Sequence, residues 1–450
     1  MRTIDSSPPA SRLPLPDSLA AVAIRPGDGD YDTVRHTYTR TGSPAAVIRV
    51  RDHEDIAAAL AHARTARLPL TVRSGGHGIS GRSTNDGGIV VDLFALNAVK
   101  VLDARSGLVR VEAGARWGDV AAQLAPHGLA LSSGDTGDVG VGGLATTGGI
   151  GLMSRLHGLT IDHMRAAELV LADGSVVRTD AEHDPDLFWA VRGAGANFGV
   201  ATAFEFQAKP VGDVIAAVTV FDAGDTAAFL TRWGAAVEAA PRTVTSFLTL
   251  MSGPGGQPVA QAMTVHAGAD TETAREALAP VLSAGPVLRN QAFVTPYHQL
   301  LPATHATQHA QQPLTVSRSG LLEHITDPAA AAITSVLVAG GAPMVQLRSV
   351  GGAVNDTPST AMAYAHRTQN FSLMAATVPA GRKDLDRHWK RLHPHLKGLY
   401  LSFETGTGRR QLQDAFPGAV LDRLMVLKSR YDPDHVFDNN FALPSADLPG

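Results

Sequence analysis

The sequence Val72-Arg73-Ser74-Gly75-Gly76-His77-Gly78-Ile79-Ser80-Gly81 follows directly on the apolar run of residues 68–72, which is typical of a buried strand. Its four glycines tolerate positive φ and let bare backbone N–H groups approach a bulky anion. Such a loop suits a pyrophosphate. A phosphate-binding loop has no need of an imidazole at its centre, so His77 indicates a second role, a ring nitrogen in covalent or close contact with the cofactor itself.

A second glycine cluster, residues 134–151, contains eight glycines, and we expect no regular helix or strand within it. Two familiar phosphate-binding motifs fit these clusters poorly. Residues 76–83 have P-loop spacing, but Arg82 replaces the lysine and a turn follows where the motif opens a helix. Residues 140–145 match a dinucleotide fingerprint, but the polar segment before them cannot be the buried strand of a Rossmann unit. If the chain were nevertheless a P-loop nucleotidase, the purified protein would be colourless and would bind ATP.

Composition restricts the partners and the chemistry. A chain of 450 residues favours two domains that share an interface. The net charge of −4 provides no basic field for nucleic acid or an anionic membrane, so we expect a small-molecule partner. The absence of cysteine excludes disulfides and cysteinyl cofactor bonds, and the 18 histidines show no metal-binding spacing, so we predict no metal. No apolar stretch is long enough for a signal peptide or a membrane span, which predicts a cytoplasmic protein with a short disordered leader.

The hydrophobic pattern predicts an α+β chain in which the type and spacing of the expected helices and strands change after Pro210. Before it, we expect a helix capped by Asp52, further helices at 117–124 and 184–193, a hairpin around Asp173-Gly174, and strands at 45–50, 68–72, 87–93, 98–102, 108–113 and 200–206. No long helix separates strands 68–72 and 87–93. After it, strands 214–221, 244–251, 259–266, 344–350 and 371–378 alternate with helices 226–239, 271–282, 327–338 and 383–392, which predicts a mainly antiparallel sheet with helices on one face.

Five segments, in this order, resemble the berberine-bridge-enzyme-like flavoproteins, a branch of the vanillyl-alcohol-oxidase superfamily. They are Arg73–His77; Asn85–Leu93; Val139–Gly143 with Gly148–Gly151, Ser154-Arg155 and Gly158-Leu159; Asp186–Val200; and Arg430–Asp434 with Phe437 and Asn440. The resemblance covers nearly the whole chain, and bacterial 6-hydroxynicotine oxidases and polyketide-tailoring oxidases are similar in these segments. It implies a two-domain vanillyl-alcohol-oxidase-type fold, with a leader and first helix region at 1–40, a PCMH-type FAD-binding domain of two α/β subdomains at 41–210, a substrate-binding domain at 211–404, and a C-terminal segment, 405–450, that returns to the FAD domain.

The resemblance also implies the cofactor and the residues that hold it. FAD would lie across the first domain with its pyrophosphate on the backbones of 74–78 and 140–143, and His77 would bond covalently to the 8α-methyl of its ring. Many relatives add a cysteinyl bond, at the position of Thr136 here. Valine at position 139 is usual in members that react with oxygen, which implies an oxidase. The residues implied in cofactor binding are Arg73, Ser74, Gly75, Gly76, His77, Gly78, Thr136, Val139, Gly142, Gly143, Gly148, Gly149, Gly151, Val200 and Asn440.

A flavin oxidase of this kind needs a group that takes a proton while hydride leaves the substrate. Tyr400 matches the tyrosine of the family's Tyr-x-Asn motif, although serine replaces its asparagine. A phenol in this role needs a nearby cation or donor, which the sequence does not identify. The other candidates are Tyr364, His366 and His157. We therefore expect an oxidase of a small alcohol, amine or secondary-metabolite intermediate that passes electrons to O2. The alternatives are a flavin-containing dehydrogenase and a cyclisation scaffold without redox turnover.

Overall fold

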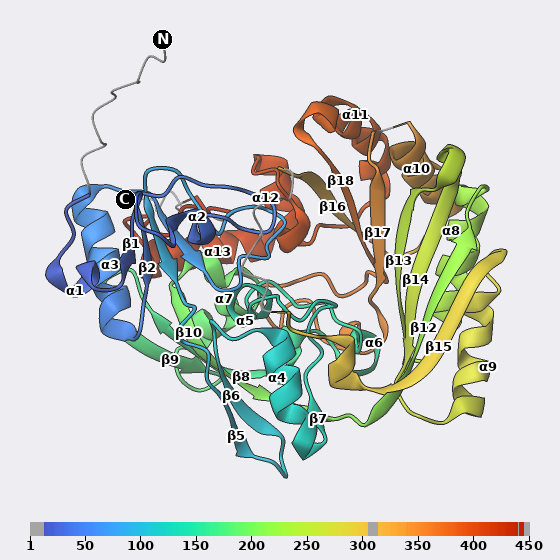
Figure 1. Cartoon of the computed structure of the whole chain (residues 1–450), viewed down its shortest axis with the longest axis horizontal. Helices are drawn as coiled ribbons and strands as arrows, with labels where there is room; N and C mark the ends of the chain where they lie inside the picture. Colours follow the sequence, from blue (N-terminus) through green and yellow to red (C-terminus); the bar gives the residue numbers. More distant parts are fainter. Residues whose placement is uncertain (1–12, 305–313, 340, 440, 445–450) are drawn as a thin grey trace.

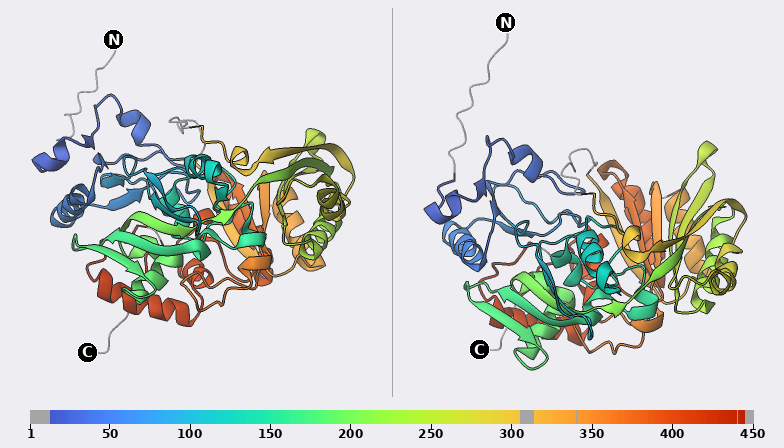
Figure 2. Two further views of the ribbon diagram at one scale, coloured as in Figure 1. Left: turned by 90° about the horizontal axis from the view of Figure 1, so that it is seen from below. Right: turned by 60° about the horizontal axis from the view of Figure 1, so that its bottom comes forward.

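The computed structural model describes residues 13–304, 314–339, 341–439 and 441–444. The disordered leader expected at the N-terminus falls on residues 1–12, outside this part. The molecule has two halves: three β-sheets with helices around them form the left half in Figure 1, and a seven-stranded sheet with its helices forms the right half. The first described helix, α1, and the last, α13, both lie in the left half (Figures 1 and 2).

The first sheet positions the loop that carries His77. Its strand order is β1-β2-β4-β3, in which β2 (Ala46–Arg49), β4 (Ile89–Asp92) and β3 (Leu70–Arg73) are parallel and β1 (Ala23–Ile24) is antiparallel. Helix α3 (His53–Ala66) begins at Asp52, whose carboxylate accepts the N–H of Asp55 at 2.9 Å. As predicted, a glycine-rich loop and no long helix joins β3 to β4. The short helix α1 (Asp17–Ala20) precedes β1, and α2 (Tyr31–Val34) lies between β1 and β2 in the chain.

The second sheet is antiparallel, with the order β5-β6-β10-β8-β9. The predicted hairpin at Asp173-Gly174 joins β8 to β9, and Gly174 has φ 91°. Its strands are β5 (Val99–Asp103), β6 (Leu108–Glu112), β8 (Met164–Val170), β9 (Val176–Asp180) and β10 (Val200–Gln207). Around it lie α4 (Trp117–Leu124) and α7 (Pro185–Ala194), and β7 (Leu129–Ala130) pairs with β11 (Lys209–Pro210). Helix α6 (Ser154–His157) instead contacts β13 (Val244–Ser252) of the seven-stranded sheet.

The expectation that residues 134–151 form no regular element was wrong at one place. Helix α5 (Val141–Ala145) lies inside this glycine cluster. Its first residues are tied to another segment, because the N–H groups of Val141 and Gly142 donate to the carbonyls of Ala115 and Ala113 at 2.9 Å. Tertiary contacts therefore override the low helix propensity of glycine here.

The seven-stranded sheet is antiparallel, with the order β15-β12-β14-β13-β17-β18-β16. Helices α8 (Thr226–Ala239), α9 (Thr271–Leu282), α10 (Asp327–Val338) and α11 (Arg382–Leu392) cover its outer face (Figure 2), and Phe221, Phe229, Trp233 and Phe371 lie in the core between them. Its strands are β12 (Asp213–Asp222), β13 (Val244–Ser252), β14 (Pro258–His266), β15 (Val287–Pro296), β16 (Val316–Leu322), β17 (Met344–Ser349) and β18 (Phe371–Thr377).

The hydrophobic pattern of the sequence did not predict β15 and β16, the two edge strands of this sheet. The first eight residues of β15 are exposed, so no buried face marks it in the sequence. Strand β16 is fully buried but carries polar residues, among them Arg318, whose guanidinium pairs with Asp386 at 2.6 Å. The α+β, vanillyl-alcohol-oxidase-type fold is confirmed by the comparisons below.

The C-terminal helices pack into the first half. Leu424 and Leu427 of α13 (Ala419–Tyr431) belong to the same buried core as the first two sheets, as does Ala415 of α12 (Arg409–Ala415). The chain thus passes through the seven-stranded half and comes back, although the boundaries at residues 41, 211 and 405 stay a prediction. Within the described residues, no helix is long and apolar enough to cross a membrane.

Candidate active site

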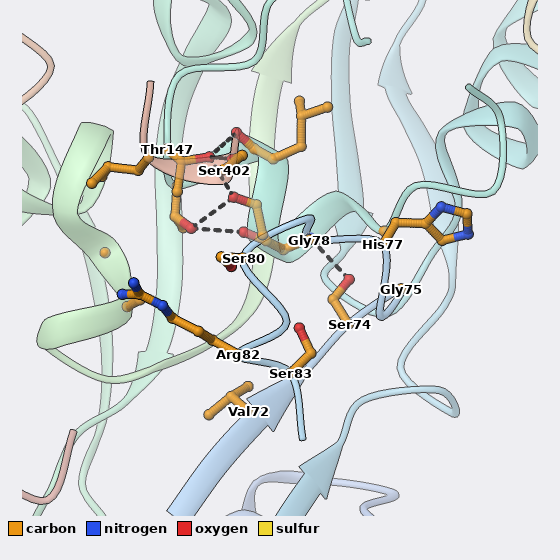
Figure 3. Close-up of a pocket in the computed structure, with 18 of the residues that line it drawn as sticks. Val72, Ser74, Gly75, His77, Gly78, Ser80, Arg82, Ser83, Thr147 and Ser402 are labelled. Carbon is orange, nitrogen blue, oxygen red and sulfur yellow. Dashed lines mark hydrogen bonds between the residues drawn. The ribbon is translucent and has the colours of Figure 1, made fainter. Parts of the chain in front are cut away.

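One cavity is lined by both glycine clusters, by the seven-stranded half and by the C-terminal tail (Figure 3). The loop after β3 contributes residues 74–78, 80, 82 and 83, and the second cluster contributes 134, 135, 139, 140, 142–144, 146, 147 and 150. The remaining walls are 70–72, 93, 193–197, 199, 201, 348, 400–403, 437, 439 and 441. Segments far apart in the chain therefore converge on one space.

The two glycine clusters touch at Gly75 and Gly140. A Cβ on either residue would overlap the backbone nitrogen of the other, so only glycine allows this approach. The hydroxyl of Ser74 donates to the carbonyl of Ala113 at 2.6 Å and accepts the N–H of Gly142 at 3.2 Å. The loop after β3 and the start of α5 are thereby locked together at the floor of the cavity.

Two arginines support this floor from outside the cavity. Arg73 is buried, pairs with Asp92 at 2.8 Å and donates to the carbonyl of Val34, so it holds the base of the loop. Arg116 donates to the carbonyls of Gly75 and Asp138, both at 2.6 Å. Neither side chain lines the cavity. Arg73, expected among the cofactor-binding residues, therefore acts on the loop.

His77 lies at one side of the cavity, next to Tyr38. The two rings stack with centroids 5.2 Å apart and planes 16° apart, and the N–H of Tyr38 donates to the carbonyl of Gly76 at 2.9 Å. In Figure 3 the half-buried imidazole points away from Thr147 and Ser402. His77 thus lies at one end of the cavity, and the hydrogen-bonded pair Thr147 and Ser402 lies in a different part of the same cavity.

The seven-stranded half contributes Tyr400, which is 3% exposed. Its phenol oxygen accepts the backbone N–H of Gly149 at 3.0 Å. Gly148 has φ 131°, and a Cβ on it would lie 3.0 Å from Cε2 of Tyr400. Nearby, the hydroxyls of Ser402 and Thr147 are hydrogen-bonded at 2.9 Å. The second glycine cluster is therefore shaped to receive the 400–402 segment, and Gly149 is the donor that the sequence could not identify.

An ion pair that sequence reasoning missed lies beside Tyr400. Arg348, on β17, pairs with Asp135 at 3.0 Å, and its guanidinium lies 4.4 Å from the ring centroid of Phe403. The rings of Phe403 and Tyr400 are 5.0 Å apart. A charged side chain inside an apolar strand pattern was the available signal for Arg348, because such a residue is buried only when it is paired.

Several expected site residues do not line the cavity. Tyr364 packs behind Tyr400 with ring centroids 6.5 Å apart, and burial raises the pKa of its phenol. His157 is half-buried on α6, and burial lowers its pKa. The catalytic role expected for these two stays a prediction that their positions do not favour. His366, Thr136, Gly148, Gly149, Gly151 and Val200 also lie outside the lining, and Asn440 is outside the described residues.

Comparisons with known proteins agree on the family. Residues 44–180 match the model of a family described as FAD binding domain. (R)-6-hydroxynicotine oxidase of Paenarthrobacter nicotinovorans is 38% identical over 200 residues, 44% of this chain and 43% of that protein. An FAD-linked oxidoreductase of Dictyostelium discoideum is 27% identical over 446 residues, 94% of each chain. The chain is an FAD-linked oxidoreductase.

Solved structures show which fold this FAD-linked oxidoreductase has. BBE-like 1 of Physcomitrella patens matches with a TM-score of 0.83 at 21% identity, over 96% of this chain and 99% of that one. Glucooligosaccharide oxidase from Acremonium strictum, which carries a 6-S-cysteinyl, 8α-N1-histidyl FAD, matches with a TM-score of 0.81 at 23% identity, over 96% and 99%. These structures show the fold, and together with the family model and the curated relatives they confirm the resemblance to the berberine-bridge-enzyme-like flavoproteins.

The cavity of this FAD-linked oxidoreductase fits its cofactor at the glycine clusters. A Cβ on Gly143 would meet no described atom within 4 Å, so the bare backbone there borders open space. The closely packed Gly75 and Gly140 present peptide groups that side chains would otherwise cover. These are the surroundings that a diphosphate requires.

Proposed function

We propose that this protein is an oxidase with covalently attached FAD, which oxidises a small organic substrate and uses O2 as the electron acceptor, forming H2O2. FAD, when bound, supplies the hydride acceptor at N5 and the site of reaction with oxygen. The observation that carries the proposal is the position of Tyr400, whose phenol oxygen is buried against the N–H of Gly149 in the cavity that also holds His77 and both glycine clusters.

Tyr400 is the proposed proton acceptor for the substrate's O–H or N–H. A backbone N–H that points at the phenol oxygen stabilises negative charge on it, and burial keeps competing water away. Phe403 packs against the Tyr400 ring and fixes its direction. Among the described residues that line the cavity, Asp135 carries the carboxylate. Because Asp135 forms an ion pair with Arg348, it is less available as a base than Tyr400.

His77 is the proposed attachment point of the cofactor. It lines the cavity directly beside the glycine loop, and the chain has no cysteine that could form a second bond. Tyr38 stacks on the imidazole and restricts its orientation. Val139 also lines the cavity, and we assign to it the control of oxygen access, because a larger side chain there would narrow the space.

The relatives suggest two substrate classes for testing. One relative is named an oxidase of 6-hydroxynicotine, and others are named oxidases of xylooligosaccharides and chitooligosaccharides. An aromatic wall with Phe403, Tyr400 and Phe441 borders the cavity. We therefore place ring-bearing alcohols and amines ahead of oligosaccharides.

The proposal is tested with purified protein. We expect a yellow protein whose colour stays in the acid-precipitated pellet, whereas His77→Ala releases its colour into the supernatant. A panel of cyclic amines, benzylic alcohols and oligosaccharides is then mixed with the protein without oxygen. A substrate should bleach the flavin, and air should restore the colour with one H2O2 formed per substrate oxidised.

Other outcomes separate the alternatives. A flavin that substrate bleaches but air fails to restore identifies a dehydrogenase. A flavin that no compound in the panel reduces, while one of the compounds is cyclised, identifies the scaffold. A colourless protein contradicts the proposal outright.

A further inference from the structure

Among the described residues that line the cavity, one cation has no ion-pair partner. Arg82 follows the His77 loop, is 9% exposed and lines the cavity. Its Nη2 donates to the carbonyl of Gly406 at 3.1 Å, but its buried Nη1 has no hydrogen-bond partner among the described residues. A buried guanidinium with an unused donor is costly unless an anion completes it.

The neighbouring carboxylates are already in use. Glu404 accepts N–H groups from Ser319 at 2.9 Å and Gly406 at 2.6 Å, and Arg318 pairs with it at 3.4 Å. Asp135, the acidic residue among those that line the cavity, pairs with Arg348. Within the described part of the cavity wall, Arg82 therefore remains as the uncompensated charge.

The packing around Arg82 fixes its direction. Its guanidinium lies over the ring of Phe441 in the C-terminal tail, 4.2 Å from the ring centroid, a cation–π contact. Figure 3 shows Arg82 and His77 extending to opposite sides of the cavity-lining residues. A second cavity also borders Arg82, and there Arg409, Asp422 and Asp438 share the lining, so its formal charges already balance without a bound anion.

We propose that Arg82 binds a phosphate group of FAD through Nη1. This inference rests on the proposed cofactor. At neutral pH the formal charge of FAD lies on its diphosphate, which is the counter-ion that the cavity lacks. The glycine clusters offer neutral N–H groups to that diphosphate, and Arg82 adds the compensating positive charge and an N–H donor of fixed direction. Arg82 occupies the position of the lysine in the P-loop pattern, and binding the FAD phosphate is its role here.

The test uses proteins that all carry His77→Ala, so that FAD binds reversibly. It compares the wild-type Arg82 with Arg82→Met and Arg82→Lys in that background, each produced as apoprotein under riboflavin limitation. We expect Arg82→Met to weaken FAD binding about ten- to a hundredfold, and Arg82→Lys to recover part of the loss. Riboflavin, which has no phosphate, should bind the wild type and Arg82→Met equally. Raising the salt concentration should weaken FAD binding more in the wild type than in Arg82→Met.

Thermal unfolding separates this role from a merely structural one. If Arg82 is paired only when the phosphate of FAD is bound, Arg82→Met should leave the melting temperature of the apoprotein unchanged or raise it. The same substitution should lower the melting temperature of the FAD-bound protein. A lower apoprotein melting temperature with unchanged FAD affinity would overturn the inference. So would a variant that binds FAD normally and shows only a raised KM, because the anion would then be a substrate carboxylate. A wild type that binds no FAD would instead refute the proposed function.

Discussion

The phenol oxygen of Tyr400 and the backbone N–H of Gly149 are hydrogen-bonded at 3.0 Å across the junction of the two halves. Gly149 has φ 83°, a conformation that favours glycine, so the donor's direction is built into the backbone. A side-chain donor could rotate away, whereas this one cannot. The pair therefore couples the shape of the cofactor loop to the proposed proton acceptor.

Replacing Tyr400 with phenylalanine should slow the chemistry and leave the cofactor in place. We expect anaerobic flavin reduction to slow by about 100- to 10,000-fold, the range for loss of a general base, with flavin content unchanged. Stopped-flow absorbance at the flavin band measures this rate. Tyr364→Phe serves as the matched control, because Tyr364 lies behind Tyr400 and outside the cavity lining. Equal rates in the two variants would remove Tyr400 from the mechanism.

Val139→Leu should act on the oxygen half of the cycle alone. Val139 is partly buried and lines the cavity, and an added methylene reduces the space beside it. We expect reoxidation of the reduced enzyme by O2 to slow about tenfold, equivalent to ~1.4 kcal/mol of barrier, while anaerobic reduction is unchanged. Mixing reduced enzyme with aerated buffer gives the rate. Val139→Ala should keep or speed the reaction, and a slow Val139→Ala would argue against a steric gate.

Three of the four outer helices were predictable to the residue because their signals are local. Asp225, Asp270 and Thr326 each accept the N–H three residues ahead, and α8, α9 and α10 begin directly after these caps, at the bounds that the sequence indicates. The cofactor loops were predictable for a related reason, since their glycines stand close together in the chain.

Contacts between distant segments could not be predicted in the same way. Whether Arg82 is paired depends on Glu404 and Phe441, more than 300 positions away, and no local pattern reports that Arg318 already holds Glu404. The sequence favoured Tyr400 over Tyr364 on a motif alone, and only the packing of the two rings separates a lining residue from one behind it.

Two buried histidines should make the fold sensitive to acid. Burial lowers the pKa of His163 and of His366 to about 4, well below their ordinary value. Below pH 6.5 the unfolded chain binds protons that the folded state does not, so stability is present above 6.5 and is lost as the pH falls toward 4. Each histidine should cost about 2 kcal/mol of unfolding free energy at pH 5.

Urea unfolding at pH 7 and pH 5 measures this loss. His163→Gln should reduce the difference between the two pH values, whatever its effect at pH 7. The exposed His127→Gln is the matched control and should leave the difference unchanged. If His163→Gln also leaves it unchanged, His163 is not among the groups responsible.

Lys428 should be essential for the part of the cavity wall that the C-terminal segment contributes. Its ammonium is fully buried and donates to Asp432 at 2.6 Å and to the carbonyls of Asn197 at 2.9 Å and Phe437 at 2.8 Å, and the last two residues line the cavity. Lys428→Met leaves Asp432 as a buried charge without its ion-pair partner and should lower the unfolding free energy by about 3–5 kcal/mol, with loss of bound flavin.

The double variant Lys428→Met/Asp432→Asn identifies the source of that cost. Removing the stranded charge should return part of the stability, because the amide oxygen introduced at position 432 can still accept the N–H of Val436 or Phe437, which both now donate to Asp432. The flavin content should stay low, since the amide makes no link from α13 to Asn197. Chemical denaturation and the ratio of flavin to protein absorbance follow the two effects. A double variant no more stable than Lys428→Met would mean that the lost carbonyl contacts, and not the buried charge, destabilise the single variant.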